Sequence, residues 1–178
     1  MNPSADRPAR IRRLVEASDA ELGQLADVLI DCVDGGASVS FMAPLSRERA
    51  LAFWRSVAAA SAGGARALLV AEDDTGIVGT VQLVLEQPEN QPHRADLAKM
   101  LVHRRARRRG LGAALLGEAE RVAVQAGRSL LVLDTASDDA ERLYERHGWV
   151  RCGRVPGYAL WPGGGRCDTV FFYRELAG

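Results

Sequence analysis

A short arginine- and glycine-rich segment is the strongest candidate for chemistry in this sequence. Residues 107–112 read Arg-Arg-Arg-Gly-Leu-Gly and separate an apolar run ending at Val102 from a helical pattern that begins near Gly110. Glycines let backbone N–H groups turn toward an anion, and a helix start adds unpaired donors and the positive end of its dipole. Arginines add charge-assisted hydrogen bonds. The segment therefore indicates a phosphate-binding loop, although such a cluster taken alone is also typical of a solvated basic loop.

The composition places this basic segment in one electrically balanced domain. The chain has 178 residues, of which 23 are lysine or arginine and 23 are aspartate or glutamate. A chain of this length buries a core without disulfides or metal. The charge balance argues against a nucleic-acid or membrane partner, so we interpret the basic segment as a local site for a small anion. We expect a flexible N-terminus over residues 1–9 and a single domain over residues 10–178.

The cysteines give no sign of a structural site. Cys32, Cys152 and Cys167 are widely spaced, without a Cys-x-x-Cys pair or a histidine at ligand spacing. We therefore expect neither a disulfide framework nor a metal site. No window approaches the roughly 18 apolar residues of a membrane span, and we interpret the sequence as that of a cytoplasmic protein.

The hydrophobic periodicity predicts about seven strands and four helices. Helices are expected from a capping box at Ser18 to Gly35, from Ser46 to Gly63, from Gly110 to Gly127 and over residues 138–147. Strands are expected over residues 11–15, 65–72, 76–86, 94–102, 130–133, 149–155 and 169–176, with a Gly/Pro-rich loop at 156–166. The run 130–133 is wholly apolar, as in a strand buried on both faces, and the crossover that precedes it implies a parallel pair. The expected fold is α/β (α+β), a mixed and mostly antiparallel sheet with helices on its faces.

Two motifs in the second half of the chain resemble those of a known enzyme family. Val102 followed by Arg107, Gly110 and Gly112 resembles the acyl-CoA pyrophosphate loop of the GNAT N-acetyltransferases, written Arg/Gln-x-x-Gly-x-Gly/Ala after a strand. The second motif of that family is Ala-x-x-Leu/Phe-Tyr-x-x-x-Gly-Phe/Trp, and it resembles Ala140, Leu143, Tyr144, Gly148 and Trp149. Both motifs stand in the family's order with one predicted strand between them. The resemblance implies a GNAT sheet splayed between its fourth and fifth strands.

A narrower likeness connects the chain with the tabtoxin-resistance acetyltransferases, which acetylate a β-lactam amino-acid toxin. It rests on the segments 35–39, 41–42, 71–74, 133–135 and 156–158. Three positions depart from the broader family pattern. Arg104 stands where a proline is common, Arg108 stands where a glycine is common, and Ser137 replaces an asparagine that helps to bind the cofactor.

The resemblance implies that acetyl-CoA, the co-substrate, lies between the strand ending at Val102 and the strand at 130–133. Backbone groups of Met100, Leu101 and Val102 would pair with the pantetheine and polarise the acetyl carbonyl. The remaining cofactor-binding residues implied by the two motifs are Arg107, Arg108, Arg109, Gly110, Leu111, Gly112, Ala113, Ser137, Ala140 and Tyr144.

Three side chains are candidates for the proton transfers that amine acetylation requires. Asp96, expected on the same strand face as Met100 and Val102, is the leading candidate base and would act through water. Asp134, at the end of a short strand, is a second candidate base; it would alternatively orient the substrate's ammonium group or cap a loop. Tyr144 resembles the family's general acid, which protonates the leaving thiolate, and its alternative is a core tyrosine.

The acceptor contacts are expected from the segment 35–44 and from the loop at 156–168. The candidate substrate-binding residues are Ser38, Phe41, Met42, Asp134 and Tyr158. The resemblance implies transfer of an acetyl group to a primary amine of a small molecule, such as a toxin, an antibiotic or an amino-acid-like compound, and a possible homodimer. Two alternatives stay open, an acetyltransferase for protein or peptide amines and a non-catalytic acyl-CoA-binding regulatory domain.

Overall fold

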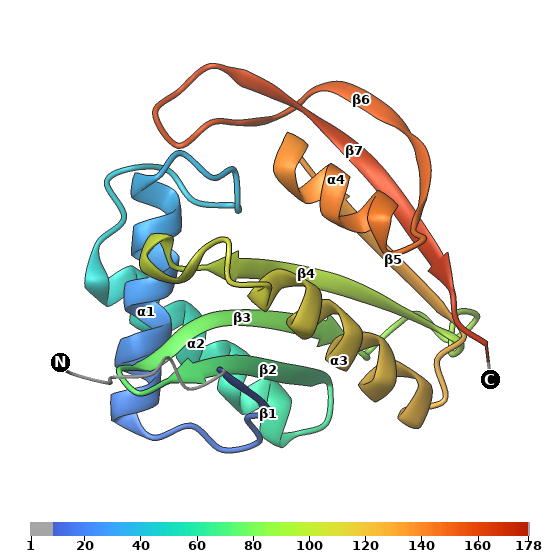
Figure 1. Cartoon of the computed structure of the whole chain (residues 1–178), viewed down its shortest axis with the longest axis horizontal. Coiled ribbons are helices and arrows are strands. Elements are labelled where there is room, and N and C mark those ends of the chain that lie inside the picture. Colours follow the sequence, from blue (N-terminus) through green and yellow to red (C-terminus); the bar gives the residue numbers. More distant parts are fainter. Residues whose placement is uncertain (1–8, 178) are drawn as a thin grey trace, which may run out of the picture.

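The computed structural model describes residues 9–177 and contains one seven-stranded sheet with the order β1-β2-β3-β4-β5-β7-β6 (Figure 1). The strands are β1 (Arg10–Arg13), β2 (Arg66–Asp73), β3 (Gly76–Val84), β4 (Arg94–Val102), β5 (Leu130–Thr135), β6 (Val150–Leu160) and β7 (Arg166–Glu175). The helices are α1 (Asp19–Asp34), α2 (Arg47–Ala62), α3 (Leu111–Gln125) and α4 (Asp138–Arg146), with a short 3-10 helix η1 (Arg104–Ala106). Only β4 and β5 pair in parallel. The predicted fold class is confirmed, and residues 1–8 of the predicted flexible N-terminus lie outside the described residues.

Local signals in the sequence place the ends of the first two helices. Ser18 and Glu21 form the predicted capping box: Glu21 N–H donates to Ser18 Oγ at 3.3 Å, and Ser18 N–H donates to Glu21 Oε2 at 2.8 Å. Ser46 Oγ accepts the N–H of Arg49 at 3.2 Å at the start of α2. Such caps satisfy backbone donors that a helix leaves unpaired at its start. Both helices therefore begin where the sequence predicts.

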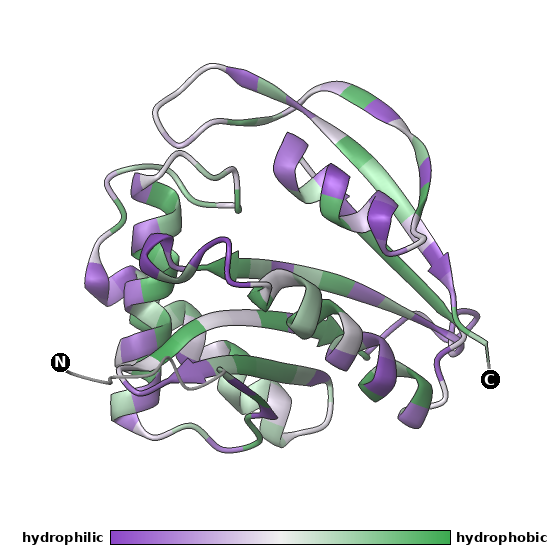
Figure 2. Cartoon of the chain, viewed as in Figure 1, coloured by the Kyte–Doolittle hydropathy of each residue, from purple (hydrophilic) through white to green (hydrophobic). Residues whose placement is uncertain are grey.

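Two apolar cores lie on opposite faces of the sheet. Trp54 and Leu25, from α2 and α1, are fully buried against one face of β2, β3 and β4, and α3 buries Leu115 against the other face. Figure 2 shows the resulting apolar colouring of β2 and β3, whereas α4 is mainly hydrophilic. Tyr144 is the only residue of α4 that is buried. The sheet from β1 to β4 is thus held rigidly on both faces, as a platform for the site requires.

The predicted splay lies between β4 and β5. These strands pair over three residues only, Arg94–Asp96 with Leu130–Val132. Beyond them β5 continues beside β7, and β4 continues beside β3. Figure 1 shows the two halves of the sheet diverging from this short junction. Within residues 9–177, β4 therefore has no strand pairing from Leu97 onward along the edge that faces β5.

A β-bulge in β4 overturns one sequence prediction. The register shifts between the pairs Thr80–Leu101 and Gln82–Ala98, so that two residues of β4 stand opposite Val81. Lys99, at the bulge, has a φ of 51°. An extra residue reverses the alternation of side chains beyond it. The prediction that Asp96 shares a strand face with Met100 and Val102 is therefore wrong, because the bulge lies between them.

Two further predictions are corrected near β5 and β6. Leu130 and Val132 are only partly buried, because α1 and α2 contact β2 to β4 and leave that face of β5 without a helix. The first half of the predicted loop 156–166 is strand: β6 runs to Leu160, and an irregularity after Val155 absorbs Pro156 and the next residues. An edge strand tolerates proline at a bulge.

Among the described residues, no helix is long and apolar enough to cross a membrane.

Candidate active site

A cleft of about 1760 Å³ opens where β4 and β5 diverge. Its walls come from the segment 35–42, β4, the loop and helix start at 106–113, the end of β5, α4, and the β6–β7 hairpin. Pockets for one small ligand are typically about 300–1,000 Å³. The cleft is thus large enough for two ligands placed end to end along the splay.

The arginine- and glycine-rich segment forms one end of this cleft, at the start of α3. Gly110, the residue that precedes the helix, has a φ of 75°, and as a glycine it provides no side chain to cap the first turn. Arg108 has a φ of 61°, a conformation that usually requires glycine. The arginine that departs from the family pattern therefore adopts the backbone geometry that glycine would adopt. The N–H groups of the first turn of α3 stay available for an anion.

Two carboxylates hold this loop to the rest of the fold. Asp31, 8% exposed on α1, accepts the backbone N–H of Arg104 at 2.8 Å and also the Nε–H of its guanidinium. Asp73, at the end of β2, pairs with Arg105 Nη1 at 3.5 Å and with Arg109 Nη1 at 3.1 Å. Hydrogen bonds from Thr75 and Arg109 outweigh the effect of burial and lower the pKa of Asp73 to about 2. The loop is consequently anchored on both sides.

These contacts divide the predicted phosphate-binding arginines into two groups. Arg107 and Arg108 line the cleft, and the Nε–H of Arg107 donates to the carbonyl of Val102 at 3.1 Å. Arg109 does not line the cleft, because its side chain is directed to Asp73. Direct contact with a phosphate is therefore supported by geometry for Arg107 and Arg108, whereas Arg109 supports the loop.

The second motif faces the first across the same end of the cleft. Gly112 is close to Leu143 of α4: a Cβ atom added to this glycine would lie 3.1 Å from Leu143 Cδ2. Ser137 begins α4, and its Oγ accepts the N–H of Ala140 at 3.4 Å. Ser137 and Ala140 line the cleft, as do Leu111 and Ala113. The absence of a side chain at position 112 thus leaves room for Leu143 beside the first turn of α3.

The middle of the cleft is bordered by the unpaired edge of β4. Met100, Leu101 and Val102 all line it, in agreement with their predicted placement. This segment follows the bulge at Lys99 and lies beyond the last pair with β5. Backbone donors and acceptors along such an open edge need partners, which an extended ligand would provide.

Tyr144 is both a core residue and a cleft residue. Its side chain is 3% exposed and packs against Trp149 and Phe172, with ring centroids 5.7 Å and 5.8 Å away. It also lines the cleft. Burial, assisted by the charge of Asp134, raises the pKa of Tyr144. The phenol is therefore protonated at neutral pH, so that a proton is present for donation.

The two candidate carboxylates occupy different places. Asp134 lines the cleft at the end of β5 and accepts the hydroxyl of Thr169 at 3.0 Å. Asp96 does not line the cleft: it accepts Gln87 Nε2 at 3.1 Å and pairs with Arg94 at 3.2 Å, at the closed junction of β4 and β5. The geometry supports Asp134, and not Asp96, as a group that reaches a bound acceptor.

The far end of the cleft contains the predicted acceptor residues. Ser38, Phe41, Met42 and Tyr158 all line it. Ser38 Oγ donates to the carbonyl of Leu160 at 3.2 Å. This contact joins the segment 35–44 to the β6–β7 hairpin, so residues that are far apart in sequence form one wall.

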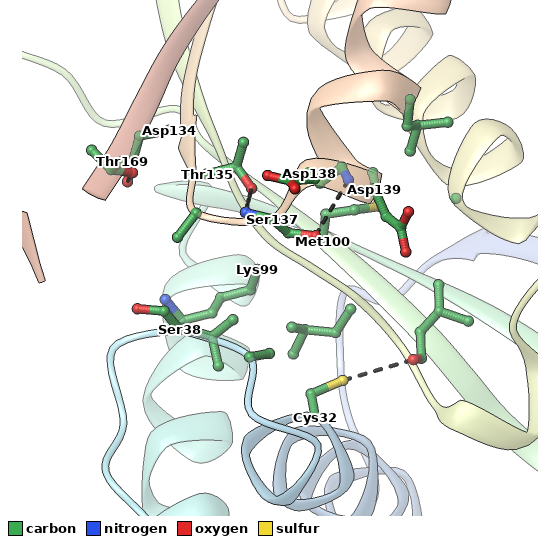
Figure 3. A pocket seen from close by; sticks show the side chains of 18 of the residues that line it. Cys32, Ser38, Lys99, Met100, Asp134, Thr135, Ser137, Asp138, Asp139 and Thr169 are labelled. Carbon is green, nitrogen blue, oxygen red and sulfur yellow. Dashed lines mark hydrogen bonds between the residues drawn. The ribbon is translucent and has the colours of Figure 1, made fainter. Parts of the chain in front are cut away.

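Sequence reasoning missed Lys99. Its side chain lines the cleft (Figure 3). Its Nζ donates to Ser40 Oγ at 3.1 Å and lies 5.9 Å from the ring centroid of Phe53. Lys99 is the only lysine of the chain, and the other 22 basic residues are arginines. The presence of a single lysine among so many arginines could have drawn attention to this residue. No pattern in the sequence predicts the bulge that directs its side chain into the cleft.

Comparison with known proteins identifies the class to which this fold and cleft belong. A family model described as the acetyltransferase (GNAT) domain matches residues 64–151, from the turn before β2 to the start of β6. Residues 64–151 therefore match the GNAT acetyltransferase domain, and the chain is an acyltransferase.

Solved structures share the fold at low sequence identity. An N-acetyltransferase from Staphylococcus aureus Mu50 is 16% identical, with a TM-score of 0.79 over 96% of this chain and 100% of that one. The ribosomal-protein-alanine N-acetyltransferase from Brucella melitensis is 23% identical, with a TM-score of 0.78 over 94% and 99%. A phosphinothricin acetyltransferase from Sinorhizobium meliloti, solved in complex with AcCoA, is 21% identical, with a TM-score of 0.76 over 96% and 90%. Proteins with different acceptors thus resemble this chain about equally, so the likeness establishes the fold and leaves the acceptor open.

Proposed function

We propose that the protein transfers the acetyl group of acetyl-CoA to the primary amine of a small molecule. The observation that carries this proposal is the continuity of the cleft, which runs from the loop at 107–112, along the open edge of β4, to the walls formed by segment 35–44 and the β6–β7 hairpin. The loop end fits a pyrophosphate through helix N–H groups and two arginines. The related phosphinothricin acetyltransferase was solved with the same co-substrate.

The residues at the splay fit the steps of acetyl transfer. Asp134, or a water beside it, accepts the proton that the acceptor's ammonium group loses. The amine nitrogen then attacks the acetyl carbonyl carbon, a C–N bond forms, and the C–S bond of the thioester breaks. Backbone N–H groups near Met100 stabilise the negative charge on the carbonyl oxygen. Tyr144 donates a proton to the departing thiolate and regains one, through water, as the attacking nitrogen loses its second proton, so the products are the amide and free CoA.

The shape of the acceptor end favours a small molecule over a protein segment. Ala43 N–H donates to the carbonyl of Pro162 at 2.9 Å, in addition to the contact between Ser38 and Leu160. The segment 35–44 and the hairpin therefore meet across this end, and an extended peptide needs an open groove instead. A small toxin, antibiotic or amino-acid-like amine fits the enclosed end better. Detoxification is the corresponding biological role, and a cytoplasmic location and a homodimer remain parts of the proposal.

A calorimetric titration with acetyl-CoA tests the first half of this proposal, and thiol release across a panel of amines tests the second. The panel contains amino acids, β-lactam amino acids, aminoglycosides and N-terminal peptides. We expect acetyl-CoA binding and thiol release with one small-molecule class. Thiol release with peptides alone would show that the acceptors are protein or peptide amines. Binding of acetyl-CoA without thiol release from any amine would favour a non-catalytic acyl-CoA-binding domain. The absence of acetyl-CoA binding would refute the proposed co-substrate site.

A further inference from the structure

Lys99 is a partly buried cation whose donors are not all used. Its Nζ makes one hydrogen bond, to Ser40 Oγ, and within the described residues no carboxylate lies within 4.0 Å of it. An ammonium group has three donors, and its transfer out of water is costly when they are unpaired. In this position, an anionic ligand would supply the missing partner.

Local backbone geometry singles out the same contact. Only three non-glycine residues of the described chain have positive φ values, and these are Ser40 (76°), Lys99 (51°) and Arg108 (61°). All three line the cleft. Such conformations are strained for residues other than glycine and persist where the surroundings enforce them, often at functional sites. Two of the three are the hydrogen-bonded partners Ser40 and Lys99.

The opposite charge stands on the other wall of the acceptor end. Figure 3 shows Asp134 beside Thr169, and Lys99 extending toward the segment that carries Ser38. Asp134 also has no cation within 4.0 Å among residues 9–177, in contrast to Asp168, which pairs with Arg154 at 3.5 Å. Burial lowers the pKa of Lys99, whereas the charge of Asp134 raises it and that of Arg66 lowers it further. Lys99 and Asp134 therefore place a cation and an anion, neither of them in a close ion pair, on two walls of the acceptor end.

We propose that Lys99 binds a carboxylate of the acceptor while Asp134 faces its amine, so that the substrate class is a zwitterionic, amino-acid-like amine. This assignment rests on the proposed acetyl transfer, because it names the acceptor of that reaction. A compact ammonium group suits the place between Ser40 and the ring of Phe53, whereas a guanidinium is broader and planar. Lys99 is a binding residue in this scheme, and the proton transfers stay with Asp134 and Tyr144.

The presence of one lysine permits a direct measurement of binding. Protein labelled with ¹⁵N-lysine gives a single side-chain Nζ resonance, and this resonance is titrated with free amino acids and with the corresponding amino acid amides, with CoA present. We expect amino acids to shift the resonance and to raise the pKa of Lys99, because an anion stabilises the charged form. The amides lack the anion and should leave both unchanged. If no amino acid moves the resonance, the proposal is refuted, whether or not the protein releases thiol.

Kinetics with the same acceptor pairs separate binding from chemistry. Lys99→Met should lower kcat/KM for an amino acid about 10- to 100-fold, as expected for the loss of a hydrogen-bonded charge pair, and should affect the amide much less. Lys99→Arg keeps the charge but has a broader head group, so it should retain the preference for the amino acid with a lower kcat/KM than the unaltered protein. Arg146→Met, which removes another cation that lines the cleft, is the matched control and should keep it too. Because each amino acid and its amide are compared in the variant and in the unaltered protein, the difference in basicity between the two amines cancels.

The possible failures are distinguishable. Equal losses for acid and amide in Lys99→Met would overturn the proposal and assign Lys99 to the chemistry, as would acetylation of Lys99 itself by acetyl-CoA. Thiol release with amides as fast as with amino acids in the unaltered protein would keep the acetyl transfer and overturn the zwitterionic substrate. A resonance shift by amino acids without thiol release from any amine would keep the anion site and remove the acetyl transfer.

Discussion

Gly112 offers the sharpest test of the co-substrate site, through the variants Gly112→Ala and Gly112→Val. An added Cβ would lie 3.1 Å from Leu143 Cδ2, so alanine requires Leu143 to move by a few tenths of an ångström. Alanine also gains about 1 kcal/mol of helix propensity over glycine. We therefore expect Gly112→Ala to be close to neutral. Valine adds two methyl groups at this contact, which displaces α4 or the first turn of α3.

The displacement should appear mainly as weaker binding of acetyl-CoA. Backbone N–H groups of the first turn of α3 reach the pyrophosphate only at close approach, and each hydrogen bond to a charged group contributes about 1.5–3 kcal/mol. Loss of one such bond corresponds to a dissociation constant about 10- to 100-fold higher, since about 1.4 kcal/mol is a factor of ten. Isothermal titration calorimetry with acetyl-CoA measures this constant directly.

Gly117 of α3 provides the matched control. It lies on the exposed side of the same helix, and a Cβ added there meets no atom within 4 Å. Gly117→Ala should raise Tm by about 2–4 °C, because it gains helix propensity without a steric cost, and Gly117→Val should bind acetyl-CoA normally. An unchanged dissociation constant in a folded Gly112→Val variant would refute the reasoning about this end of the cleft.

Three further variants test separate parts of the site. Tyr144→Phe should lower kcat at least tenfold and leave acetyl-CoA affinity and Tm nearly unchanged, since the ring contacts remain; full activity would return Tyr144 to a purely packing role. Asp31→Asn should lower Tm by several degrees and raise KM for acetyl-CoA, because the buried carboxylate that holds Arg104 is lost; a shift in neither would show that the loop needs no anchor. Asp73→Asn tests the pH dependence: the pKa of Asp73 is depressed to about 2, so its stabilising effect is complete above about pH 4 and disappears as the pH falls toward 2. Thermal unfolding of wild type and Asp73→Asn should therefore differ at pH 5 and converge near pH 2, and a constant difference would contradict this linkage.

Much of the fold could be predicted because its signals are local. The capping box at Ser18, the cap at Ser46 and the apolar periodicity of α3 each act within a few residues, and the structure contains all three helices within a residue or two of the predicted bounds. The parallel pair of β4 and β5 followed from the crossover between them. The length of β6 could not be predicted from the sequence, because proline and glycine are typical of loops. Only the pairing with β7 shows that this edge strand accommodates them.

The cleft residues also divide into those that the sequence predicts and those that only the tertiary structure places. The sequence by itself determined the loop at 107–112, the family resemblance, and the placement of Tyr144 and Asp134, because these depend on residue type and spacing along one stretch of chain. Tertiary structure alone excluded Asp96 from the cleft and directed Lys99 into it. Both outcomes depend on the bulge in β4 and on where β5 leaves β4, and strand register is set by pairing between distant segments rather than by local propensity.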